Sequence, residues 1–75
     1  MKGAARVVID GRDMQPPEPL ERALAALDTL PAGGELCMLL YCHPVPLFNI
    51  LRQNGFVWQE SVGDDGTHEI LIRRA

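Results

Sequence analysis

Hydrophobic and polar positions along the chain predict four strands. Residues 7–9 are a short β-branched run, and residues 35–42 are apolar almost throughout, a pattern typical of a central strand. Residues 56–62 and 68–74 predict two further strands, because residues 63–67 between them, G-D-D-G-T, are typical of a hairpin turn. The chain therefore carries a short first strand, a buried second strand and a C-terminal hairpin.

Leucine-rich segments with helical spacing lie between these strands. The first predicts a helix over residues 17–29, and the second predicts a shorter helix that opens at residues 43–46 and ends at Gly55. Both begin with the same pattern, P-x-P-L-x-x-x-L, which starts at Pro17 and at Pro44. Two interpretations of this repeat are open. Proline stiffens each turn while the leucines dock each helix, or the chain contains a duplicated strand–helix unit with a site between its two turns.

The order of these segments, βαβαββ, predicts a single domain over residues 1–75 of the α/β (α+β) class. We expect a two-layer sandwich with a four-stranded mixed sheet and both helices on one face, because right-handed crossovers make the first three strands parallel. Ligands usually bind at the carboxyl edge of such a sheet. The same topology gathers five polar or reactive residues on that rim: Asp10, Arg12, Cys42, His43 and His68.

Composition and charge narrow the classes of function. With 47% hydrophobic and 23% charged residues, the chain is apolar enough to build its own core, and we expect no cofactor to be required for folding. The formal net charge is −3 and the seven Lys and Arg residues are scattered, so neither nucleic acid nor an anionic membrane is an expected partner. No apolar run approaches the ~20 residues that span a bilayer, and polar residues 10–13 interrupt any signal core. These features predict a cytoplasmic protein.

The two cysteines, Cys37 and Cys42, fall in the same predicted strand. In an extended chain they point to opposite faces about 16 Å apart, whereas a disulfide needs Cα atoms within ~7 Å. We therefore predict two free thiols or metal ligands in a reducing compartment. Cys37 suits the core or the sheet surface, and Cys42 lies just ahead of the second helix.

The turn after the first strand resembles a family signature. Residues 10–19, D-G-R-D-M-Q-P-P-E-P, precede a leucine-rich helix and resemble the D-x-R-G-L-x-C-P-x-P signature of the TusA (SirA-like) family of sulfur-carrier proteins. Asp10, Arg12, Pro17 and Pro19 match the signature. The resemblance extends to the element order of nearly the whole chain, and it implies the family's two-layer fold with the last strand between the second and the third.

Three positions depart from that signature. The family's glycine is Asp13 here, its leucine is Met14, and its persulfide-bearing cysteine is Pro16. The last departure removes the family's activity at that position. The chain resembles uncharacterised TusA-related domains of prokaryotes, which are similar to partners of hemerythrin-like and cupin modules and are sometimes fused to them. That resemblance implies a protein partner and no established reaction.

Sulfur chemistry is one alternative for the predicted rim. It requires an exposed thiolate, ideally at a helix N-terminus where the helix dipole favours the anion, and Cys42 is the candidate. His43 is adjacent and able to assist deprotonation, and the family's cysteine position, Pro16, is expected on the same rim. Cys42 would then be a relocated nucleophile. The opposing interpretation is that a strand cysteine is an inert, buried hydrophobe.

Metal or haem binding is a second alternative, because Cys42, His43 and His68 are suitable ligand types. If the last strand pairs beside the second, His68 begins near the place where Cys42 ends. Against this, adjacent residues of an extended chain point apart, and the sequence has no C-x-x-C or H-x-x-x-H spacing. We expect Asp10 and Arg12 to hold the first loop as an N-capping or ion-paired turn.

A binding module is the function that the sequence favours. In residues 35–42 both alternating sets of side chains are apolar, while helices cover only one face of a two-layer domain. The second set needs a cover such as a partner chain or a second copy, and Phe56, Trp58 and Leu71 raise the same question unless they complete the core. We therefore predict a non-enzymatic interaction or carrier module that uses its strand-carboxyl edge and open sheet face.

Overall fold

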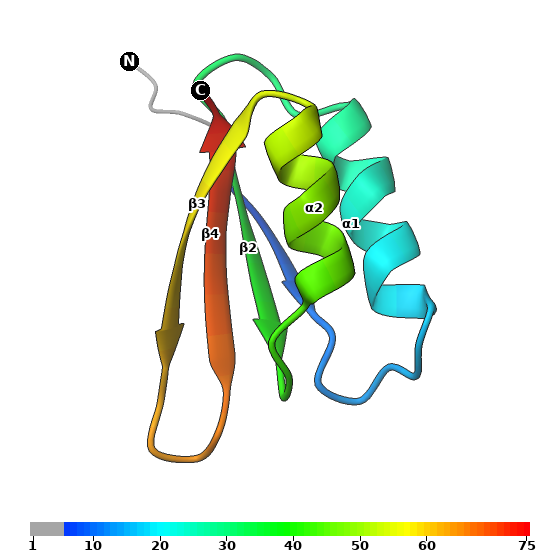
Figure 1. Cartoon of the computed structure of the whole chain (residues 1–75), viewed down its shortest axis with the longest axis vertical. Coiled ribbons are helices and arrows are strands. Elements are labelled where there is room, and N and C mark those ends of the chain that lie inside the picture. The colour runs from blue at the N-terminus through cyan, green and yellow to red at the C-terminus, as the bar shows by residue number, and fades with distance from the viewer. Residues whose placement is uncertain (1–5) are drawn as a thin grey trace.

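Six elements follow one another in the order that the sequence predicts. The computed structural model describes residues 6–75, so residues 1–5 of the predicted domain lie outside the described part. The elements are β1 (Arg6–Asp10), α1 (Glu18–Asp28), β2 (Glu35–Leu40), α2 (Val45–Gln53), β3 (Phe56–Val62) and β4 (His68–Arg74). Both helices pack on the same side of the sheet (Figure 1). Neither helix has the length and apolar character needed to cross a membrane.

The strands form one mixed sheet in the order β1-β2-β4-β3. β1 pairs with β2 in parallel, and β4 lies antiparallel between β2 and β3. β1, β2 and β3 therefore run in the same direction, which places their carboxyl ends and the start of β4 at one end of the sheet (Figure 1). The two layers, the mixed sheet and the position of β4 confirm the predicted fold class.

The hydrophobic core lies between the sheet and the helices. Alternate residues of the two central strands point toward the helices, because side chains change face at every step along a strand. These residues are almost fully buried: Leu36, Met38 and Leu40 of β2, and Ile70 and Ile72 of β4. The helices contribute Ala23 and Leu27 of α1 and Leu47, Phe48 and Leu51 of α2.

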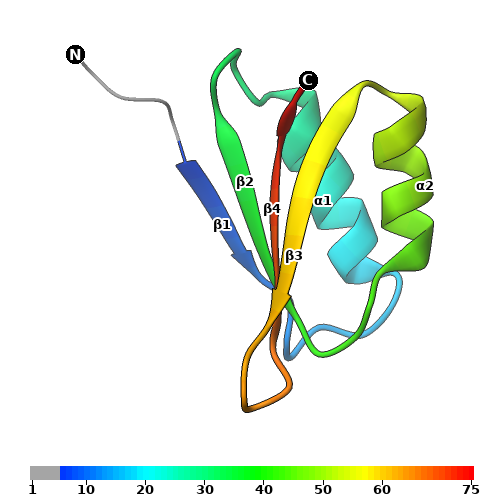
Figure 2. The same ribbon diagram turned by 60° about the vertical axis from the view of Figure 1, so that its left-hand side comes forward.

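The far face of the sheet carries no helix, as the turned view shows (Figure 2). Phe56 and Trp58 pack against the core on the helix side, so they complete the core. Leu71 pairs with Cys37 on the uncovered face, where Leu71 is half-buried and Cys37 is buried. At the outer strands of the sheet, Val8 is 58% exposed and Val57 is 41% exposed. The open face is thus apolar in its centre.

The second strand ends two residues earlier than the sequence predicts. β2 stops at Leu40, and Tyr41 and Cys42 lie in a bend that leads to α2. The cause is the lack of a neighbouring strand, because β1 pairs no further than Leu39 and β4 begins opposite Leu40 at His68. The prediction that Cys42 ends a strand is therefore wrong. Cys42 is an exposed free thiol in the connection to α2.

Candidate functional site

The candidate site lies at the end of the sheet where β1 and β2 run into the two helices. In both connections one proline lies just before the helix and a second proline lies in the first turn of the helix. Proline suits these positions because the first N–H groups of a helix have no partner within it. The first connection ends with Pro17 and Pro19, and the second with Pro44 and Pro46.

In the β1–α1 connection, Asp10 and Arg12 bind each other. The Arg12 guanidinium donates through Nε to Asp10 Oδ1 at 2.9 Å and through a terminal nitrogen to Oδ2 at 2.8 Å. The Arg12 backbone N–H donates to the same carboxylate at 3.2 Å. These hydrogen bonds from Arg12 lower the pKa of Asp10 to about 2, and the pairing raises the pKa of Arg12. The predicted ion-paired turn is present.

Between these two residues, Gly11 packs closely against the end of β2. Its backbone N–H donates to the Leu39 carbonyl at 2.8 Å, which continues the β1–β2 pairing by one bond. A Cβ atom at Gly11 would lie 2.8 Å from Leu40 Cδ2 and 3.4 Å from the Leu39 oxygen. A side chain at position 11 would therefore require the Leu40 side chain to shift. The first connection leaves the sheet directly over the end of β2.

An apolar groove separates the two connections. Its volume is about 430 Å³, and its lining is apolar apart from Arg12, Tyr41, Cys42 and His43. Met38, Leu40 and Leu47 contribute core side chains to the lining. Five of the chain's six prolines also line it: Pro16, Pro17, Pro19, Pro44 and Pro46. The second interpretation of the repeated P-x-P-L pattern placed a site here, and the structure provides a cavity between the two turns.

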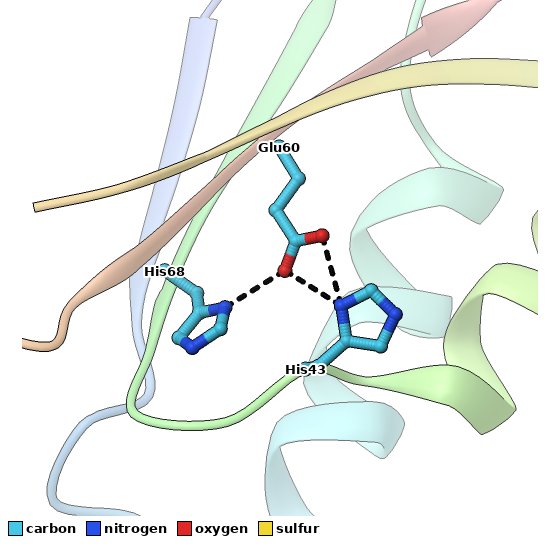
Figure 3. A group of neighbouring side chains, drawn as sticks. All are labelled: His43, Glu60 and His68. Atoms are coloured by element: carbon cyan, nitrogen blue, oxygen red, sulfur yellow. Dashed lines mark hydrogen bonds and ion pairs between the residues drawn. The ribbon is translucent and has the colours of Figure 1, made fainter.

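His43 also contacts two polar side chains outside the groove, Glu60 and His68 (Figure 3). His43 Nδ1 lies 2.8 Å from Glu60 Oε1 and 2.9 Å from Oε2, and His68 Nδ1 lies 2.8 Å from Oε2. We call these three residues the His–Glu–His cluster. Desolvation acts to raise the pKa of Glu60, but the hydrogen bonds with His68 and His43 outweigh it, so the pKa lies below its usual value.

Aromatic contacts fix one histidine of the cluster. The His43 ring meets the Phe48 ring edge-on with centroids 4.9 Å apart. Phe48 in turn stacks on Trp58, again with centroids 4.9 Å apart and planes 11° from parallel. Offset and edge-on arrangements are the favoured geometries of such rings. The stack joins α2 to β3 and places the His43 imidazole against the Glu60 carboxylate.

Some of the residues predicted for the site lie together in the structure, and others do not. The structure brings His43 and His68 together, keeps Asp10 and Arg12 as a separate pair, and places Cys42 on the groove. Glu60 was missed. The signal was present in β3, where Phe56, Trp58 and Glu60 alternate, so a carboxylate occupies a position that faces the helix layer. The proposed roles of Cys42, His43 and His68 in sulfur transfer or in metal or haem binding stay predictions.

Comparison with known proteins places the chain among SirA-like, or TusA-like, domains. The crystal structure of a SirA-like protein from Desulfitobacterium hafniense matches with a TM-score of 0.74 and 25% sequence identity, over 88% of this chain and 93% of that chain. Residues 8–74 match the family described as uncharacterized conserved protein (DUF2249). The chain therefore belongs to the DUF2249 family. No curated protein matches its sequence.

Proposed function

We propose that this DUF2249 chain is a non-enzymatic interaction module of the cytoplasm, which binds a protein partner through the apolar groove between its two strand-to-helix connections. The observation that carries the proposal is the groove itself, a cavity of about 430 Å³ at the carboxyl edge of the parallel strands. Grooves of this size at this edge of α/β sheets are common ligand sites.

The proline-rich wall supports binding rather than catalysis. Proline has a fixed backbone φ and a rigid ring, so a wall of prolines loses little conformational entropy when a partner docks. Proline also has no N–H group, so these residues donate no backbone hydrogen bond to an occupant. The one strong charge on the groove, Arg12, is neutralised by Asp10. Such a surface fits a large apolar or aromatic side chain of a partner.

Selection of random peptides displayed on phage tests this proposal. We expect enrichment of peptides with one or two large apolar anchors, and the substitution Met14→Glu in the groove should weaken their binding at least about tenfold, as loss of an interface hot spot does. Val57→Glu on the open sheet face is the matched control and should leave binding unchanged. Failure to enrich peptides, or peptides that bind the Met14→Glu variant equally well, would contradict the proposal.

Sulfur transfer through Cys42 is a second candidate, and one observation favours it. Cys42 is exposed and lines the same groove as Pro16, which occupies the cysteine position of the TusA-like signature. In the proposed step, the Cys42 thiolate attacks the outer sulfur of a donor persulfide. A new Sγ–S bond forms, the donor's S–S bond breaks, and the donor thiolate leaves with the electron pair.

Intact mass after incubation with a persulfide donor and an alkylating trap tests this step. We expect one added sulfur atom on the wild-type chain and none on the Cys42→Ser variant. The buried Cys37 is the internal control, since it should remain unmodified in both proteins. The candidate fails if Cys42 stays a free thiol alongside an active donor.

A further inference from the structure

Both histidines of the chain converge on one carboxylate. His43 comes from the connection before α2, Glu60 from β3 and His68 from the first residue of β4, so three separate elements supply the His–Glu–His cluster (Figure 3). The chain contains only two histidines, 25 residues apart in sequence. One potential ligand atom from each of His43, Glu60 and His68 lies within 4.8 Å of the other two. The groove does not explain this arrangement, because Glu60 and His68 are not among its lining residues.

We propose that the His–Glu–His cluster binds one divalent transition-metal ion through an imidazole nitrogen of each histidine and the Glu60 carboxylate. Imidazole and carboxylate together suit Zn²⁺, Fe²⁺ and their neighbours in the first transition row, whereas Ca²⁺ and Mg²⁺ take oxygen ligands. Metal–nitrogen and metal–oxygen bonds are about 2.0–2.2 Å long, so ligand atoms of one ion lie about 3–4 Å apart. The Nδ1–carboxylate contacts of the cluster are 2.8–2.9 Å, so the proposal requires the side chains to turn slightly apart when the ion enters.

The backbone holds the two sheet ligands in register. Glu60 pairs with Ile70, and His68 pairs with Val62, so the two ligands lie diagonally across the β3–β4 ladder on one face. That face is the helix side, because Ile70 belongs to the core. A ligand pair fixed by strand pairing is preorganised, which is what a metal site requires of its supports.

The third ligand, His43, approaches from the helix layer, and the site remains accessible to solvent on the side of this residue. The His43 ring is held by the edge of Phe48, and its side chain is 53% exposed, against 20% for His68 and 19% for Glu60. Three protein ligands leave at least one coordination position for water or an exogenous group, as in sites that bind a substrate, and unlike closed structural sites. An ionised carboxylate only accepts hydrogen bonds, so without metal each Nδ1–H donates to Glu60; to bind the ion through Nδ1, each imidazole carries its proton on Nε2 instead.

Cys42 is not part of the proposed ligand set. Among residues 6–75, the group of potential ligands around His43 consists of Glu60 and His68. Cys42 lies on the groove, although it is the neighbour of His43 in sequence. The proposal therefore replaces the predicted Cys42–His43–His68 set with a nitrogen and oxygen set. It does not rest on the proposed binding role of the groove, although His43 borders both the groove and the cluster.

Titration with Co²⁺ tests the proposal on the purified chain. Bound Co²⁺ gives visible absorption bands, and a paramagnetic ion near Trp58, two residues from Glu60 and on the same strand face, quenches the fluorescence of this single tryptophan. We expect one Co²⁺ per chain and competition by Zn²⁺. His43→Ala, His68→Ala and Glu60→Gln should each weaken Co²⁺ binding at least about 100-fold, more than loss of an outer-shell partner does.

Two controls define the ligand set. Cys42→Ser and Glu21→Gln, the latter an exposed carboxylate on α1, should bind Co²⁺ as the wild type does. A wild-type chain that binds no Co²⁺, or His68→Ala and Glu60→Gln variants that bind it normally, would overturn the proposal. A loss of binding in Cys42→Ser would overturn the exclusion of Cys42 from the ligand set. If Glu60→Gln fails to fold, His43→Ala decides the question, because that ring is half exposed and lies outside the core.

Discussion

The two strand-to-helix connections begin alike and are completed differently. Both leave a parallel strand, enter a P-x-P-L-x-x-x-L helix and line the same groove. In the first, Asp10 is paired with Arg12, two residues away. In the second, His43 is paired with Glu60, 17 residues away on β3, and through it with His68. The pair in the first connection is local and stabilises that loop. The pair in the second connection joins it to β3 and β4 and so forms the His–Glu–His cluster.

The two helices that follow these connections differ in how far their leucines are buried. Leu47 and Leu51 of α2 are 2% and 0% exposed, but their counterparts in the repeated pattern are not buried to that degree. Leu20 is half-buried, and Leu24 is 37% exposed. The leucines of the same sequence pattern are therefore buried in α2 but only partly buried in α1. Four tests sharpen or break this comparison, from the largest expected effect to the smallest.

The largest effect is expected at the leucines. Leu51→Ala should lower the free energy of unfolding by about 2–5 kcal/mol, because it removes a fully buried side chain and leaves a cavity. Leu24→Ala, at the same position of the repeated pattern, should lower it by less than about 1 kcal/mol. Urea unfolding followed by circular dichroism measures both. Equal losses would show that the two helices dock alike.

The thiols provide the second test. Cys42 in the second connection is exposed, whereas Cys37 is buried, and desolvation together with the nearby Glu69 carboxylate raises the pKa of Cys37. In native protein, Cys42 should react with Ellman's reagent at least about 100-fold faster than Cys37, which requires local opening. Cys42→Ser and Cys37→Ser variants assign the two phases. A fast phase that survives Cys42→Ser contradicts the burial difference.

The third test asks what the long-range pairing contributes to stability without metal. In the presence of a chelator, Glu60→Gln should lower the free energy of unfolding by about 1–2 kcal/mol, because it weakens two hydrogen bonds to a charged, mostly buried carboxylate. The matched control is Glu18→Gln, which breaks an exposed ion pair with Arg22 and should change stability by no more than about 0.5 kcal/mol. Equal changes in the two variants would contradict the distinction between local and long-range pairing.

The smallest effect is expected at the pair that closes the first connection. The pKa of Asp10 is lowered to about 2 from its ordinary value of 3.8. A carboxylate with a lowered pKa stabilises the fold above its ordinary pKa, and this contribution is lost as the pH falls through the folded-state value.

The stability difference between wild type and Asp10→Asn should therefore be present at neutral pH and shrink as the pH falls from about 4 to about 2. Thermal unfolding at a series of pH values measures it. Asp65, whose pKa is lowered chiefly by hydrogen bonds from Thr67, is present in both proteins. A difference that is constant with pH would show that the pair does not form in solution.

Much of the fold could be predicted because its signals are local. Strand and helix periods, the prolines that open each helix and the hairpin residues 63–67 act over a few positions, so the six elements and their order follow from the sequence. The end of β2 could not be predicted in this way. Residues 41 and 42 continue the apolar run, but no strand lies beside them, and pairing rather than apolar character ends a strand.

By itself, then, the sequence determined the six elements and their order, the two layers and the rim that carries Asp10, Arg12, Cys42, His43 and His68. The local Asp10–Arg12 pair followed from the sequence, but only the tertiary structure decided that His43 and His68 meet at Glu60. Glu60 reaches His43 and His68 because β3 pairs with β4 in one particular register, and a shift of one residue would turn Glu60 to the other face of the sheet. That register is set by packing across the whole sheet, so no local pattern around Glu60 specifies its partners.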